Sequence, residues 1–465
     1  MRNYTKTISA IAIILVGLFY SPNAFAATHT ALSCSSADVA AAIAAASNGD
    51  IVTIPAGACT WTSGISLSSS KLLTLKGAGA ASTVISHGAI TAISLVGAHR
   101  ISGIGFTLTS SGGTSIEARH QGWRIDHCSF TNSTGSSQYA IQANGTNQTV
   151  MPAGLIDNND FIEGRIDVSG MGTFLKNSGF WAADPVIGTA NQVYIEDNSF
   201  YKTVSDGGDV IDSGRASSYV ARYNTVKGRT EFMTHGWQDE DERGTRSWEI
   251  YGNSFTAASS TFTAIWMRSG TGVIAYNQFS NYSYDITFDD NRAAGSCADC
   301  DTVKLCSGLS YADGNILTNG WPCRDQIGRG KDASVWSANT TNPSPVQESS
   351  PAYLFVNRRS TGNSSVYAHN GTGAWIQSDR DYYTYNASFN GASGVGCGTL
   401  ANRPTSCTPG VAYWATNQSC TDTTGMVGAN PSNPIKGTLY KCNANRQWEE
   451  YYTPYTYPHP LRGSF

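Results

Sequence analysis

One six-residue phrase recurs along the chain, and it limits the folds that the chain can adopt. Each copy starts with an aliphatic residue and ends five positions later with an aromatic one. The copies are ISGIGF, IDHCSF, IDNNDF, IEDNSF, a degenerate ARYNTV, IYGNSF and IAYNQF, starting at residues 101, 125, 156, 195, 221, 250 and 274. Starts separated by 24 to 39 residues have the period of a solenoid.

Strands account for the repeat better than helices do. Apolar residues at helical spacing over two helices per repeat are missing, whereas glycine turns and two-residue alternation favour a parallel β-helix. Aligned copies put the aliphatic and aromatic positions in two inward columns. A third column starts at Cys128 and continues as Asn159, Asn198, Asn224, Asn253 and Asn277. Stacked side-chain amides can hydrogen-bond the coils above and below.

The segment WRIDHCSF, residues 123–130, places an acid, an imidazole and a thiol side by side. The repeat assigns all three to the scaffold. Cys128 occupies the first position of the asparagine column, which predicts a buried structural thiol. His127 stands where other copies carry turn residues. Trp123 falls in an inward column with Val193, Tyr219 and Trp248.

WRIDHCSF also resembles the W-I-D-H segment of pectate lyases, and the helix expected over residues 38–46, the KGAG turn and the asparagine column are similar too. The resemblance covers roughly residues 34–290. It implies an all-β, right-handed parallel β-helix that acts on or binds polysaccharide. The R-x-P-x-x-R segment of pectate lyases and the triple-aspartate and G-H-G patterns of polygalacturonases have no match, so it predicts the fold better than the reaction. The stretch from Gly320 to Arg462 is similar to that of exported bacterial β-helix proteins.

The first residues have the pattern of a secretory signal peptide. Arg2 and Lys6 precede an apolar run from Ile8 to Tyr20, and small residues suit cleavage after Ala26. The run is too short to span a bilayer, so we expect a secreted or periplasmic monomer that does not span the membrane. Removing the signal takes the formal net charge from −4 to −6. A mildly acidic protein is a poor candidate for binding nucleic acid.

Eleven cysteines in an exported chain predict disulfides, with one thiol left over. The pairs closest in sequence are 34–59, 397–407 and 420–442, and Cys128 is the expected free thiol. The remaining cysteines are Cys297, Cys300, Cys306 and Cys323. Disulfides are the first interpretation of this cluster, and a structural zinc site is the alternative.

A column of acids follows the inward aliphatic residues. Asp126, Asp157 and Glu196 occupy it in successive copies, and Arg222 and Tyr251 continue it. Carboxylates about 5 Å apart repel one another unless something neutralises them. Calcium accepts several carboxylate oxygens and is the cofactor that this column predicts. The alternative is a solvated stripe balanced by arginines.

The segment from Gly228 to Asn253 is the richest in reactive side chains, although charged residues make up only 14% of the chain. Aligning the glycines that end successive segments (Gly170, Gly214, Gly236 and Gly270) predicts two columns. One contains Arg165, Asp209 and Glu231. The other contains Asp212 and Arg268, with His235 beside it. We predict catalytic roles for His235, Arg246, Arg268 and Glu231, and substrate-binding roles for Arg222, Trp237, Trp266, Asp209 and Asp212.

Three functions suit these residues. In β-elimination from a uronate, His235 would remove the proton while Arg246 and Arg268 hold the carboxylate, and tryptophans would stack on sugar rings. Hydrolysis would instead use two carboxyls, Glu231 with Asp209 or Asp212. A noncatalytic polysaccharide-binding or surface-structural protein is the third. Elimination, by a polysaccharide lyase, is the first choice.

The repeat fades after about residue 290, where cysteines and aromatics replace it. We therefore expect three parts: a signal peptide over residues 1–26, a β-helix core over 27–290, and irregular coils and a cap over 291–465. The last part would pack on the helix and cover its open edge. An independent sugar-binding module is the alternative for this part.

Overall fold

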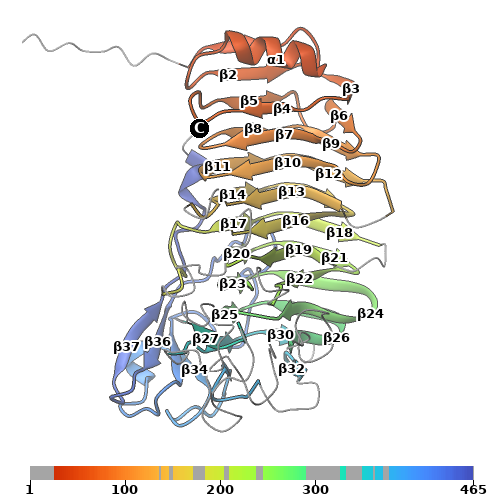
Figure 1. Cartoon of the computed structure of the whole chain (residues 1–465). Helices are drawn as coiled ribbons and strands as arrows, with labels where there is room; N and C mark the ends of the chain where they lie inside the picture. Colours follow the sequence, from red (N-terminus) through yellow and green to blue (C-terminus); the bar gives the residue numbers. More distant parts are fainter. Residues whose placement is uncertain are drawn as a thin grey trace, which may run out of the picture.

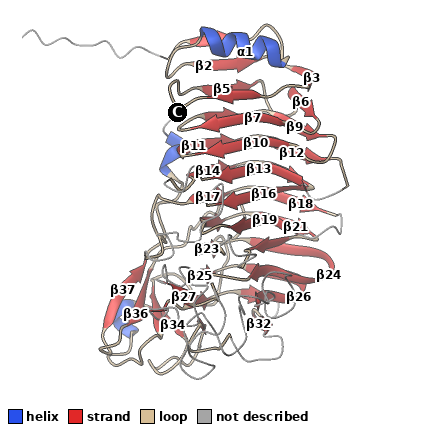
Figure 2. Cartoon of the chain, in the orientation of Figure 1, coloured by secondary structure: helices blue, strands red, loops and turns tan. Residues whose placement is uncertain are grey.

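The chain folds into a right-handed parallel β-helix, seen here in a computed structural model (Figure 1). The structure describes residues 26–135, 138–145, 150–170, 184–203, 209–236, 244–289, 325–330, 348–359, 362–369 and 376–463. The described part is mostly strand, with one α-helix, α1 (Ser36–Ala45), at one end (Figure 2). The predicted fold class is confirmed.

Each coil contributes strands to three faces, and neighbouring coils pair in parallel. The first face consists of β1 (Thr28–Thr30), β2 (Ile51–Ile54), β5 (Thr74–Gly77), β8 (Arg100–Ser102), β11 (Gln121–Asp126), β14 (Ala153–Asp157), β17 (Val193–Glu196), β20 (Ser218–Arg222), β23 (Ser247–Tyr251), β25 (Thr271–Ala275), β29 (Ala352–Phe355) and β33 (Tyr382–Thr384).

The second and third faces share the long strands β24 (Ser254–Met267) and β26 (Gln278–Asp289), which bend from one to the other. The second face also has β3 (Gly57–Trp61), β6 (Thr83–His87), β9 (Gly105–Leu108), β12 (Ser129–Asn132), β15 (Asp160–Ile162), β18 (Ser199–Lys202), β21 (Thr225–Gly228), β30 (Arg358–Arg359) and β31 (Gly362–Asn363). The third has β4 (Ile65–Leu67), β7 (Thr91–Val96), β10 (Thr114–Arg119), β13 (Gln138–Asn144), β16 (Gly164–Ser169), β19 (Asp209–Gly214), β22 (Glu231–Met233) and β32 (Val366–His369).

The inward columns fill the interior as the repeat predicts. Phe106, Phe130, Phe161 and Phe200 stack in successive coils, with ring centroids 5.3, 5.0 and 4.7 Å apart. The degenerate copy places a valine after Phe200. There the ring of Phe232 fills the space, packing edge-on against its neighbours. A smaller residue in one column is thus compensated from an adjacent strand.

The asparagine column forms a hydrogen-bonded ladder at the corner between the first and second faces. The Asn159 side chain and peptide N–H both donate to Asn198 Oδ1 at 3.0 Å, and the same pattern repeats in each later coil through Asn277. The ladder ends one coil later, at Asn357. That residue escaped the sequence pattern because its copy, LFVNRR, has Arg359 in the aromatic position.

WRIDHCSF belongs to this scaffold. Cys128 is buried and unpaired, and its backbone N–H donates to Asn159 Oδ1, as predicted from its position in the ladder. Burial raises the pKa of the Cys128 thiol to about 12, which makes it unreactive. His127 has a left-handed backbone, with φ 52°, and equivalent residues of later coils share it: Asn158, Asp197, Tyr223, Gly252, Tyr276 and Val356. The predicted turn role of His127 is confirmed.

The two ends of the helix are closed differently. Helix α1 covers β1 and β2, and the Cys34–Cys59 disulfide ties it to β3 as predicted. Beyond residue 290, β29 and β33 add coils to the β-helix. A four-stranded sheet follows: β34 (Val395–Gly398), β35 (Ala412–Ala415), β36 (Thr438–Cys442) and β37 (Trp448–Tyr452). Its apolar side packs on the outward tyrosines and aliphatic residues of the first face.

Two predicted disulfides were wrong. The bonds are Cys397–Cys420 and Cys407–Cys442, not 397–407 and 420–442. Cys442 lies at the end of β36, and its backbone N–H donates to Val411 O, so strand pairing brings it to the turn that holds Cys407. The predicted cluster of Cys297, Cys300, Cys306 and Cys323 lies outside the described residues, as does the predicted signal peptide up to Phe25.

The residues after β37 form what we call the C-terminal strap, residues 453–463, which ends in the short 3-10 helix η3 (Pro460–Gly463). It runs back along the first face, so that the C-terminus lies beside β8 and β11 (Figure 1). None of the described helices is long and apolar enough to cross a membrane.

Candidate functional site

The acids of the first face are paired with arginines. Strand register places Asp126, Asp157, Glu196, Arg222 and Tyr251 in one outward column, as predicted. Each of the three carboxylates is contacted by an arginine through two nitrogens. The pairs are Arg100–Asp126 at 2.7 and 2.8 Å, Arg124–Asp157 at 2.8 and 2.9 Å, and Arg222–Glu196 at 2.7 and 2.5 Å. Burial alone would raise the pKa of Asp126, but hydrogen bonds from Arg100 and His127 hold it below its usual value.

The C-terminal strap covers this column. Arg462 reaches Asp157 at 3.3 Å and Glu196 at 2.9 Å, and also contacts Asp197. Arg222, fully buried, donates to the carbonyls of Tyr455 and Thr456. Arg222 therefore does not face a substrate, contrary to the prediction. The residues do not fit calcium either, because arginines already satisfy the carboxylates. Within the described part of the chain, no cluster of three or more His, Cys, Asp and Glu could hold a metal.

The third face carries an acidic cluster on its outward side. β16, β19 and β22 pair so that Asp167 lies directly opposite Asp212, and Asp209 directly opposite Glu231. Their neighbours Ile166, Ile211 and Phe232 point into the core. Because strands alternate, the acids face outward on adjacent coils, about 4.8 Å apart from strand to strand.

Partners orient two of these acids. Buried Asp212 contacts His235 Nε2 through Oδ2 at 2.9 Å. Asp209 accepts a hydrogen bond from Arg165 at 2.5 Å, and the Arg165 guanidinium lies over the ring of Tyr139, 4.1 Å from its centroid. Arg165, Asp209 and Glu231 therefore come together as the sequence predicted.

Burial and like charge leave the other two carboxyls with raised pKa values. Desolvation, reinforced by the charge of Asp209, raises the pKa of half-buried Glu231 to about 8, against the opposing charges of Arg268 and Lys202. Desolvation and the charge of Asp212 raise the pKa of Asp167 to about 6. At neutral pH Glu231 is therefore mainly a neutral acid, and Asp167 mainly a carboxylate.

The two predicted arginines do not lie together. Arg268 follows β24, contacts the sulfur of Met233 and lies over the ring of Trp266, 4.8 Å from its centroid. Arg246 precedes β23, on the far side of the turn toward the first face, where it lines a pocket that also contains Asp184. The geometry therefore does not support the predicted grip of both arginines on one carboxylate. Trp237 lies outside the described residues.

Aromatic side chains continue the outward face beyond the acids. Trp266 stands in the same column as Asp212, because the strand register puts Met233 opposite Asp212 on one side and opposite Trp266 on the other. The indole N–H of Trp266 donates to Asp289 at 2.9 Å. On the next two coils, Tyr284 and Tyr367 stack with centroids 4.4 Å apart. Flat rings in a row beside carboxyl groups suit a chain of sugar rings lying along the solenoid axis.

The glycine alignment was wrong by one residue at each of its glycine pairs, and it missed Asp167 for that reason. Gly214 lies opposite Ser169 rather than Gly170. A bulge between Asp209 and Ile211 then restores the alignment of Asp209 with Glu231. The glycine alignment does not allow for the bulge. It therefore places Asp212 in one column with Arg268 and puts no other acid in the column of Asp167. The repeated aspartates of GRIDVS and DVIDSG are the signal that could have found it.

Comparison with known proteins gives a weak similarity to a solved structure and no match to a family model or a curated protein. No family model matches the chain, and no curated protein matches it either. Among solved structures it is similar to the catalytic domain of a GH87 alpha-1,3-glucanase in complex with tetrasaccharides, with 12% identity and a TM-score of 0.29. The match covers 73% of this chain and 64% of the other, so the chain spans less than two thirds of that protein.

Proposed function

We propose that the protein is a glycoside hydrolase that acts on a neutral polysaccharide at the acidic cluster of the third face. One observation carries the proposal: two half-buried carboxyls on the same outward face, Glu231 and Asp167, have pKa values on opposite sides of neutrality. A protonated acid and an ionised base within one site is the requirement of glycosidic hydrolysis.

The roles follow from the protonation states. Glu231 donates its proton to the glycosidic oxygen as the bond to the anomeric carbon breaks. Asp167 takes a proton from the water that attacks that carbon, and the products are two shorter sugars. The strands that carry the two residues are two coil spacings apart, about 10 Å along the axis. Glu231 also stands two positions along its strand from the column of Asp167, so there is room for a water between the two side chains. A water between the carboxyls is the arrangement of inverting enzymes.

Asp212 and His235 act on the carboxyls rather than on the sugar. Asp212 lies between the two coils, is buried, and its negative charge contributes to both raised pKa values. His235 holds it at 2.9 Å. We assign Asp212 as a positioning residue that keeps Glu231 protonated and Asp167 a stronger base.

Elimination, the first choice from the sequence, is not supported by this geometry. It needs cationic side chains on the uronate carboxylate, but Arg246 lies beyond the turn and Arg165 is paired with Asp209. Of the two arginines predicted to hold the carboxylate, this leaves Arg268 beside the acids. The ionised acids on these adjacent coils would repel a uronate. A neutral sugar chain avoids that repulsion, and the aromatic rings beyond the acids suit it.

The test is to incubate the protein with neutral and uronate polysaccharides, following reducing ends and absorbance near 235 nm together. Hydrolysis predicts reducing ends without absorbance, and a loss of at least about 100-fold in Glu231→Gln and in Asp167→Asn. Asp160→Asn is the matched control, because Asp160 is exposed on the second face. Rising absorbance would instead identify a lyase. No signal on any substrate, or full activity in both variants, would reject the proposal.

A further inference from the structure

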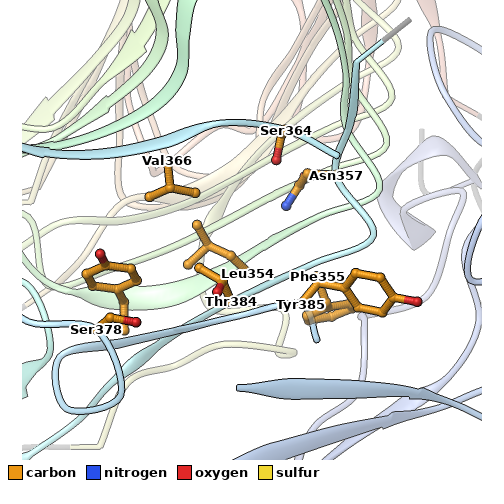
Figure 3. Close-up of a pocket in the computed structure, with 9 residues that line it drawn as sticks. Leu354, Phe355, Asn357, Ser364, Val366, Ser378, Thr384 and Tyr385 are labelled. Carbon is orange, nitrogen blue, oxygen red and sulfur yellow. The ribbon is translucent and has the colours of Figure 1, made fainter. Parts of the chain in front are cut away.

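A pocket opens away from the acidic cluster, near the end of the solenoid opposite α1, and Figure 3 shows it in close-up. It has a volume of about 360 Å³, within the range of small-ligand sites. Leu354, Phe355 and Asn357 are buried and form its floor, whereas Ser378 is exposed at its mouth.

The pocket exists because the last coil breaks the inward pattern. Ile274 lies opposite Leu354, but the next residue in that column is Thr384. In the aromatic column, Phe279 is followed by Arg359, whose side chain turns away to Asp285 at 2.8 Å. The positions of Thr384 and Arg359 are filled by apolar side chains in earlier coils. In the last coil neither position holds an apolar side chain that fills the interior, so a space with a partly polar lining remains.

The asparagine ladder also ends at this pocket. Asn357 Oδ1 accepts from the Asn277 backbone and side chain at 3.1 and 3.0 Å, like its predecessors. The register of β29 with β33 puts Ala387 where the next asparagine would stand. Among the described residues, the Asn357 peptide N–H consequently finds no side-chain oxygen in a following coil, and this residue lines the pocket.

The lining defines the chemistry of a ligand. Among the described residues, the lining contains hydroxyls, one amide, two aliphatic side chains and aromatic rings, and none of these side chains is an Asp, Glu, Lys, Arg or His. Figure 3 shows Ser364 and Asn357 on the opposite side of Leu354 from Ser378, with Thr384 beside Leu354. Aromatic faces suit the C–H faces of a sugar ring, and hydroxyls and amides suit its hydroxyl groups, whereas no described side chain of the lining is a cation that could hold a carboxylate.

We propose that this pocket binds one neutral pyranose unit, without catalysis, at the end of the solenoid. It is a binding site separate from the acidic cluster, and it does not depend on the reaction proposed there. A free monosaccharide and the end of a longer chain share this chemistry, and the size of the probe distinguishes them.

The test uses the Asp167→Asn protein, so that no sugar is consumed, and measures binding by calorimetry and saturation-transfer NMR. The probes are glucose, galactose, mannose, glucuronate and galacturonate, together with neutral oligosaccharides of these hexoses. We expect at least one neutral sugar to bind, and its uronate at least ten-fold more weakly. Monosaccharide binding equal to that of oligosaccharides means that the pocket takes a free unit, and tighter oligosaccharide binding means that it takes a chain end.

Two variants locate the binding. Thr384→Ile restores the aliphatic residue of the inward column, fills the space, and should weaken binding at least ten-fold without lowering the melting temperature. Thr256→Ile, at an exposed threonine of the second face, is the matched control. Ser378→Ala at the exposed mouth gives a second reading if Thr384→Ile fails to fold. The proposal is overturned if no neutral sugar binds, or if binding survives both pocket variants unchanged. Either result leaves the hydrolase test unaffected.

Discussion

At the scale of single residues, neighbours decide what each carboxyl can do. Asp126 and Asp167 both face outward on strands of the same solenoid. Hydrogen bonds and charge from arginine keep the pKa of Asp126 low against the effect of burial. Burial, reinforced by the like charge of Asp212, raises the pKa of Asp167 to about 6. The first is structural and the second can exchange a proton near neutral pH.

The pH dependence of activity should follow from these shifts. Asp167 must be ionised, so activity should fall as the pH drops through about 6, and Glu231 must be protonated, so activity should fall as the pH rises through about 8. Asp212→Asn removes the like charge, which lowers the pKa of Asp167 and should move the acid limb to lower pH. Rate profiles from pH 4 to 10 measure this, and an acid limb that does not move would contradict the role of Asp212.

A glycine beside a tryptophan makes a packing prediction. Gly154 lies opposite Trp123, and a Cβ there would stand 2.3 Å from the indole ring. Gly154→Ala should therefore lower the free energy of unfolding by about 1–3 kcal/mol, the usual effect of overpacking. Urea denaturation measures it. Gly463→Ala is the control, because no atom lies within 4 Å of its added Cβ.

Single residues are also where prediction from sequence failed. The column of Asp126, Asp157 and Glu196 was predicted correctly, because the corner asparagines keep the register constant there. The third face has no such marker, and one bulge beside Asp209 was enough to hide Asp167. A shift of one residue exchanges inward and outward positions, so bulges decide which side chains share a site.

At the scale of elements, the corner ladder joins the coils. Asn198 accepts two hydrogen bonds from Asn159 and donates to Ile156 O and to Asn224 Oδ1. All of these groups are buried, so each lost bond leaves a polar group unsatisfied. The ladder was predictable because it repeats in sequence, whereas Asn357 was not, since its coil is separated from the previous one by 80 residues.

Asn198→Ala should lower the free energy of unfolding by about 3 kcal/mol, because it orphans groups in the coils on both sides. Cys128→Ala, at the first position of the same column, should cost much less, since Cys128 contributes only a weak donor from its side chain. Chemical denaturation of both variants tests the difference. Equal losses would mean that the asparagine amides add nothing beyond packing.

At the scale of the whole molecule, the C-terminal strap contacts residues that are distant in sequence. Arg124 donates to the carbonyl of Arg462, 338 residues away, and Glu196 accepts from the His459 backbone. Nothing in the repeat predicts this, because the contact depends on how far the flanking sheet carries the chain back along the first face. The acidic column was visible in the sequence, but its partner from the strap was not.

Removing the strap's charge should destabilise the fold. Arg462→Ala leaves Asp157, Glu196 and Asp197 with one cation fewer in a mostly buried setting, which typically costs about 3 kcal/mol. Thermal and urea unfolding measure the loss. Arg446→Ala, at an exposed turn before β37, should change little. An unfolding free energy unchanged in Arg462→Ala would show that Arg100, Arg124 and Arg222 suffice.

The strap also bears on how the molecule comes apart. In a solenoid each coil touches only its neighbours, so unfolding can start at one end and proceed coil by coil. Here one segment is bonded at once to β11, β14, β17 and β20, through Arg124, Asp157, Glu196 and Arg222. None of these coils can open without breaking its own bonds to the strap, and a loosened strap holds the other three coils less firmly. The middle of the protein should therefore unfold as a single cooperative unit, while the coils on either side remain free to fray.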